Sequence, residues 1–129
     1  MDYNKLISVS GFSELFELVS SKTDGAIVRS LENGSTKFIP SRVHQFSHLE
    51  SIEVYTSDEN VNLIEVFKSM NASTQAVPSE KDNKAIKAYF EQVYPQMDFE
   101  RVYTSDMKKM IRWFIAIKKN SIELKLTES

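Results

Sequence analysis

The chain has 129 residues, of which 41% are hydrophobic and 26% are charged, so it suits one globular domain or two very small ones. Its formal net charge of −2 excludes a strong overall attraction to nucleic acid or membranes, and the absence of cysteine excludes disulfides and thiolate metal sites. No apolar run is long enough to span a bilayer, and no signal-peptide pattern is present, so we expect a cytoplasmic protein.

The first part of the chain alternates short apolar segments with turn residues, which is typical of an all-β unit. Residues 12–19 fit both a helical stripe and a strand, and the strand is favoured because residues 20–25 then form a hairpin connection. Residues 41–49 are expected to form a short helical or 3₁₀ turn with Val43, Phe46 and Leu49 facing inward. Asn33-Gly34 predicts a type I′ hairpin turn. The remaining strands are predicted at residues 6–9, 26–31, 37–39 and 52–55.

The second part of the chain has the apolar periodicity of amphipathic helices. Three helices are predicted, over residues 63–71, 81–94 and 105–120. We therefore expect an α+β fold in which residues 1–58 form a small N-terminal SH3-like β-barrel and residues 59–129 form a C-terminal three-helix domain. Residues 121–126 alternate between polar and apolar side chains and are compatible with a C-terminal strand.

The pentapeptide VYTSD occurs twice, at residues 54–58 and 102–106, each time ahead of a predicted helix. Thr, Ser and Asp side chains accept hydrogen bonds from the unpaired amides of a first helical turn. We interpret the repeat as the same helix entry used twice, with an internal duplication as the alternative. The segments upstream of the two copies align weakly, which favours the capping interpretation.

The chain offers little catalytic chemistry. His44 and His48 have the i, i+4 spacing of a zinc-binding helix, but no third ligand is evident. With three glycines, the sequence contains no phosphate-binding loop and no nucleophile elbow. We expect no enzymatic activity, no metal and no cofactor.

The third predicted helix has the strongest functional signal because five basic residues accompany one acidic residue, a local charge of +4. A basic helix with an adjacent tryptophan suits phosphate contacts and base stacking. The alternative is a solvated face whose last lysines complement the helix dipole, with the tryptophan packed against the β unit. The candidates for nucleic-acid or partner binding are Lys108, Lys109, Arg112, Trp113 and Lys119.

Several blocks of sequence resemble a bacterial family typical of Bacteroidetes, the domain-of-unknown-function family 5606. These blocks are residues 7–11, 28–34, 49–56 and much of residues 89–114. The resemblance extends from about residue 4 to residue 118, and it implies a bacterial cytoplasmic protein with a small β domain followed by a helical domain. It transfers no catalytic or binding residue.

These observations predict a non-enzymatic binding or adaptor module that contacts a protein partner. The alternative is a nucleic-acid-binding protein that uses the basic face of the last helix. No membrane association is expected.

Overall fold

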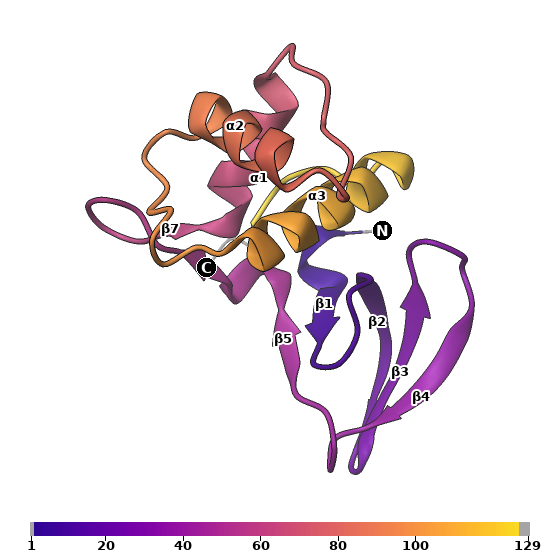
Figure 1. Ribbon diagram of the computed structural model, residues 1–129. Coiled ribbons are helices and arrows are strands. Elements are labelled where there is room, and N and C mark those ends of the chain that lie inside the picture. The colour runs from indigo at the N-terminus through magenta and orange to yellow at the C-terminus, as the bar shows by residue number, and fades with distance from the viewer. Residues whose placement is uncertain (1, 127–129) are drawn as a thin grey trace.

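The computed structural model describes residues 2–126 and consists of an antiparallel sheet beside a group of three helices (Figure 1). The strand order in the main sheet is β4-β3-β2-β1-β5. The first four strands lie side by side in sequence order, and β5 returns to pair with β1. The main strands are β1 (Leu6–Val9), β2 (Phe16–Lys22), β3 (Gly25–Ser30), β4 (Thr36–Pro40) and β5 (Phe46–His48). The short strands β6 (Glu53–Val54) and β7 (Val61–Asn62) form a second, two-stranded sheet.

The main sheet is open, so the prediction of an SH3-like barrel is wrong, although the α+β class and the three helices are observed. β4 and β5 are the two edges of the sheet and do not pair with each other. The predicted last strand, residues 52–55, contributes β6, which pairs with β7 rather than with the main sheet. Phe46–His48 pairs with β1 instead, and the chain then leaves the sheet through a 3₁₀ turn at Leu49–Ser51.

The predicted hairpins are present with different turns. β2 begins at Phe16, in agreement with the strand interpretation, but it continues to Lys22. The loop between β3 and β4 is longer than a two-residue turn, and within it the Gly34 amide donates to the Ser30 carbonyl. Gly34 has a positive φ of 75° and Asn33 does not, which excludes a type I′ turn. The inward orientation predicted for Val43 is wrong, since this side chain is 67% exposed.

The three predicted helices are confirmed as α1 (Leu63–Ala72), α2 (Asn83–Val93) and α3 (Thr104–Lys119). Their boundaries follow local capping: the Asn62 side chain accepts from the Ile64 amide, and the Asp82 side chain accepts from the Ala85 amide. Residues 121–126 form no strand, but Ile122 is buried against the helices.

The capping interpretation of VYTSD holds for one copy only. In the first copy, Thr56 accepts from the Asp58 amide and donates to the Glu59 carbonyl, which forms a turn several residues before α1 begins. In the second copy, the Asp106 carboxylate accepts from the Tyr103 amide at 3.0 Å, the bond by which the third residue of a helix closes its N-terminus. Identical sequences therefore have different local structures.

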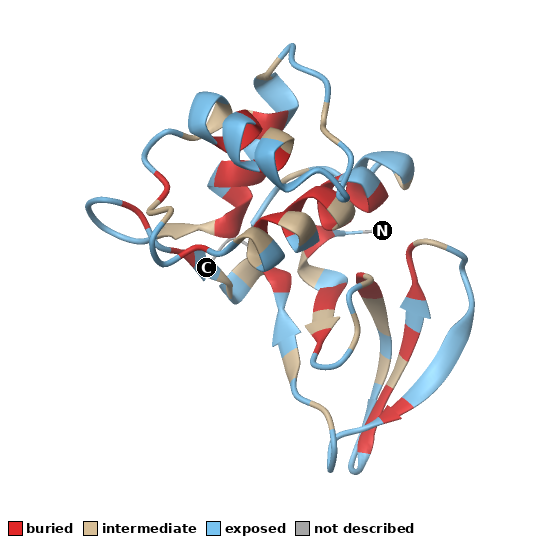
Figure 2. Ribbon diagram, viewed as in Figure 1, coloured by how far each residue is buried: buried red, intermediate tan, exposed pale blue. Residues whose placement is uncertain are grey.

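α3 lies between the sheet and the other two helices (Figure 1), and buried positions continue along it (Figure 2). The larger apolar core joins the helices to residues from the start of the sheet region, among them Tyr3, Leu6, Leu15, Leu31 and Leu49. The larger core therefore contains residues from both sides of position 58, and the division into two domains stays a prediction. A smaller core fills one face of the sheet: Ile7, Val9, Phe16, Ala26, Val28 and Ile39.

The sheet depends on close backbone approach at Gly25. A β-carbon at this position would lie 2.2 Å from the Ile39 carbonyl oxygen, a backbone atom that no side-chain rotation can move away. We expect Gly25→Ala to lower the free energy of unfolding by about 2 kcal/mol, the range of overpacking substitutions, as measured by urea denaturation. Thr23→Ala, at an exposed position in the same turn, is the control. A Gly25→Ala protein as stable as this control would contradict the packing described here.

Candidate functional site

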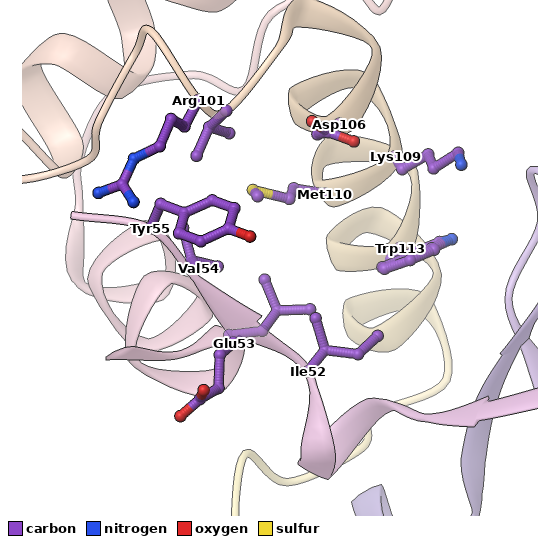
Figure 3. A pocket seen from close by; sticks show the side chains of 11 residues that line it. Ile52, Glu53, Val54, Tyr55, Arg101, Asp106, Lys109, Met110 and Trp113 are labelled. Carbon is purple, nitrogen blue, oxygen red and sulfur yellow. The ribbon is translucent and has the colours of Figure 1, made fainter. Parts of the chain in front are cut away.

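The two VYTSD copies, which are far apart in sequence, contribute to the same pocket. Val54 and Val102 are buried, whereas Tyr55 and Tyr103 are 46% and 64% exposed. Both valines line a cavity of about 240 Å³ between β6 and α3, which we call the β6–α3 pocket (Figure 3). Each copy of the repeat therefore supplies one apolar side chain to the pocket, a role that the capping interpretation did not include.

The β6–α3 pocket has an apolar floor and a charged rim. The floor consists of aliphatic side chains, one methionine and the single tryptophan of the chain: Ile52, Val54, Leu63, Val102, Met110 and Trp113. The rim consists of Glu53, Tyr55, Arg101, Asp106 and Lys109. Such a floor excludes water from an apolar ligand, while the rim distinguishes ligands by charge.

One wall of the pocket is fixed by Arg101. Its guanidinium carbon lies 4.5 Å from the centre of the Tyr55 ring, and it donates to the Asp98 carboxylate at 2.7 Å and to the Thr56 carbonyl at 3.2 Å. The hydrogen bond from Arg101, together with that from the Glu100 amide, lowers the pKa of Asp98. These contacts place the Arg101 guanidinium over the ring of the exposed Tyr55 at the rim of the pocket.

The opposite part of the rim lies on α3 and includes Lys109, a cation with no partner in the described part of the chain. Asp106 accepts from the Tyr103 amide, whereas the Lys109 ammonium forms no hydrogen bond or ion pair within residues 2–126. Figure 3 shows the Glu53 and Lys109 side chains on opposite sides of the pocket. Each side of the pocket therefore has both signs of charge: Glu53 and the Asp98-paired Arg101 on the β6 side, and Asp106 and Lys109 on the α3 side.

The backbone of β6 has an open edge at the pocket. The Leu63 amide donates to the Ile52 carbonyl at 2.9 Å, so Ile52 is in a hydrogen-bonded pair with α1's first residue. Because such pairs alternate along an antiparallel ladder, the amide and carbonyl of Glu53 point away from β7. β7 is the one strand paired with β6 in the described part of the chain.

Further along this edge, residues 96–98 pair with residues 55–57. The Asp98 amide donates to the Tyr55 carbonyl, and the Ser57 amide donates to the Gln96 carbonyl. The pairing ends there because the chain turns, with the Val102 amide donating to the Asp98 carbonyl at 2.8 Å. The pocket thus begins where an existing strand-like pairing stops.

The sequence-predicted site residues are distributed over three cavities. Lys108, Lys109 and Arg112 line a second cavity of about 390 Å³, the lysine pocket, together with Ser13, Glu80, Lys81 and Ser105. Arg112 and Lys119 line a third cavity beside it, whereas Trp113 faces the β6–α3 pocket. Lys109 lines both the lysine pocket and the β6–α3 pocket.

Arg112 and Trp113 are both engaged in contacts between α3 and the sheet region. Arg112 donates to both carboxylate oxygens of Glu32, at 2.5 and 2.9 Å. The Trp113 indole is 7% exposed and donates to the Ser13 carbonyl at 2.9 Å. Lys119 donates to the Glu32 carbonyl at 3.4 Å, so these three residues hold α3 in place.

Tyr55, Arg101 and Met110 line the pocket but were not among the site residues predicted from the sequence. The repeat was the available signal, since it marks two exposed tyrosines that each follow a buried valine. The spacing of apolar residues in the sequence gave no indication that the two VYTSD copies meet at one pocket.

The paired histidines do not share a helical face. His44 bonds to the Ser10 carbonyl through Nδ1, and His48 lies in strand β5. Residues 2–126 contain no group of three or more potential metal-ligating side chains. No helix of the described chain is long and apolar enough to cross a membrane.

Comparisons with known proteins place the chain in context. The model of the family described as Domain of unknown function (DUF6852) matches residues 52–117, which include every residue of the β6–α3 pocket. The resemblance to a domain of unknown function is confirmed, but the family number 5606 is wrong.

A solved structure also matches. It is a solution NMR structure from Bacteroides vulgatus, determined by a structural genomics consortium, with 28% sequence identity and a TM-score of 0.67. The match covers 91% of this chain and 86% of that chain. Comparison with curated proteins gives no match.

The Arg112–Glu32 pair makes stability depend on pH. The hydrogen bond from Arg112 lowers the pKa of Glu32 below the ordinary value of 4.5, so the pair contributes stability above that value, and this contribution is lost as the pH falls through the lowered pKa. We expect Glu32→Gln to reduce the free energy of unfolding by about 0.5–1 kcal/mol at neutral pH, because the pair is partly exposed.

Urea denaturation of the wild type and of Glu32→Gln, at about pH 7 and about pH 3, checks this prediction, with Glu91→Gln at an exposed position of α2 as the control. The difference between wild type and Glu32→Gln should shrink at the lower pH. An equal difference at both pH values would contradict the prediction.

Proposed function

The chain belongs to the family described as Domain of unknown function (DUF6852), and we propose that it is a non-enzymatic binding module that receives an extended peptide segment of a protein partner in the β6–α3 pocket. The single observation that carries this proposal is the juxtaposition of an open strand edge at Glu53 with the apolar floor between β6 and α3. A cytoplasmic location stays a prediction.

The open edge supports main-chain recognition. An extended peptide that adds to a strand edge uses its backbone amides and carbonyls for affinity, whatever its side chains are. At Glu53 one amide and one carbonyl are oriented for this purpose, directly beyond the point where residues 96–98 stop pairing. The peptide would continue the edge that these residues begin.

The apolar floor supports side-chain recognition. Alternate residues of a bound strand point to the same side, so one apolar side chain of the peptide would enter the cavity between Val54 and Met110. The cavity volume of about 240 Å³ is below the ~300–1,000 Å³ of typical small-molecule sites. A peptide side chain suits this size better than a cofactor does.

The nucleic-acid alternative has less support from the geometry. Base stacking needs an exposed aromatic face, whereas Trp113 is buried and bonded to Ser13. Arg112, one of the predicted phosphate contacts, is paired with the Glu32 carboxylate. Lys108 and Lys109 are the remaining candidates on that surface.

We expect the protein to select peptides with an apolar anchor from a display library of random dodecapeptides. Binding of a selected tryptophan-free peptide should change the fluorescence of Trp113, the single tryptophan, which lines the pocket. Glu53→Pro should weaken binding at least roughly tenfold because proline lacks the amide that faces the peptide. Ile52, with φ −80° and ψ 132°, has the backbone conformation that a following proline requires.

Glu53→Ala is the matched control, because it removes the same carboxylate and keeps the amide. Circular dichroism of both variants verifies folding, and amide chemical shifts of the wild-type protein with peptide should change at residues 52–55 and along α3. Selection of no peptides, or shifts confined to a distant surface, would refute the proposal.

A further inference from the structure

We propose that the segment bound in the β6–α3 pocket is acidic on one side of its apolar anchor, and that Lys109, Lys108 and Lys81 recognise these acidic residues. This inference rests on the proposed function and adds the chemical class of the partner. It begins from the position of Lys109, which lines both the β6–α3 pocket and the lysine pocket. The two cavities therefore adjoin at one cation on α3.

The lysine pocket has cations without internal partners. The side chains of Lys81, Lys108 and Lys109 form no hydrogen bond or ion pair with any other residue from 2 to 126. Arg112, at the far end, already binds the Glu32 carboxylate with two donors. Three ammonium groups thus remain for a ligand.

The carboxylates near these lysines do not cancel their charge. Among residues 2–126, Glu80 is the one acidic side chain that lines the lysine pocket, together with three lysines that have no internal partner. Asp106 lines the adjoining β6–α3 pocket and adds a second carboxylate, which accepts from the Tyr103 amide, so three lysines and two carboxylates leave a local charge of +1. The local excess of positive charge contrasts with the net charge of −2 of the whole chain.

The charges around the β6–α3 pocket also give the bound segment a direction. On the β6 side the Arg101 charge is balanced by Asp98, so Glu53 leaves no excess of positive charge there. By contrast, Lys109 on the α3 side leads to Lys108 and Lys81. An extended segment with its anchor in the pocket would therefore have acidic residues toward the lysines only. Exposed pairs of this kind fix orientation and partner choice more than they add affinity.

Peptide selection with charge-reversed protein tests this inference. We expect the wild type to enrich Asp and Glu on one side of the apolar anchor, and Lys108→Glu/Lys109→Glu to lose this enrichment while it still selects the anchor. A wild-type-selected acidic peptide should bind the double variant roughly tenfold more weakly, and its binding to the wild type should weaken with added salt.

The matched control is Lys84→Glu/Lys87→Glu, which makes the same change of charge on the exposed surface of α2. Enrichment of the anchor without acidic residues would overturn this inference and leave the proposed function intact, whereas no enrichment at all would overturn both. Retention of oligothymidine that depends on Lys108 and Lys109, without acidic bias in the peptides, would assign the lysines to nucleic acid instead.

Discussion

The structure depends on one helix being packed on two sides. α3 has buried residues at more positions than a single amphipathic stripe requires: Met107, Met110, Ile111, Trp113, Phe114, Ala116 and Ile117. One side packs against the other helices, as in the approach of the Phe67 and Phe114 rings, whose centres are 6.1 Å apart. The other side meets the sheet region through Trp113, whose indole donates to the Ser13 carbonyl. Each fully buried large side chain contributes about 1.5–3 kcal/mol before entropy losses, so this helix connects both layers strongly.

The β6–α3 pocket is a consequence of this arrangement. β6 follows the 3₁₀ turn through which the chain leaves the main sheet, and its partner β7 leads directly into α1. α3 is joined to the sheet region by the hydrogen bonds of Arg112 to Glu32 and of Trp113 to Ser13. An apolar cavity remains between β6 and α3, with Arg101 and Tyr55 forming its wall.

The basic side chains on α3 have two different roles, although the sequence predicted them as one group of binding candidates. Arg112 and Lys119 contact Glu32 and position the helix, whereas Lys108 and Lys109 have no internal partners in the part of the chain that the structure describes. Whether a charged side chain on a helix is structural or available to a ligand depends on which residue packs opposite it in the folded protein. That opposite residue, Glu32, is 80 positions away from Arg112 in the sequence.

The sequence by itself determined the elements whose stability is local. The helical periodicity specified α1, α2 and α3 within a few residues, and apolar segments beside turn residues specified β1, β3 and β4 and favoured a strand at β2. Tertiary structure alone decided that the sheet stays open, that Phe46–His48 becomes its fifth strand and that the two VYTSD copies meet at one pocket. Periodicity fixes which side chains share a face, but it contains no information about which distant segment covers that face. One of the two interpretations of the sequence already placed Trp113 against the β unit. Strand pairing, the hydrogen bond of Trp113 to Ser13 and the pairing of Arg112 with Glu32 are contacts between particular distant residues, and only the folded chain specifies them.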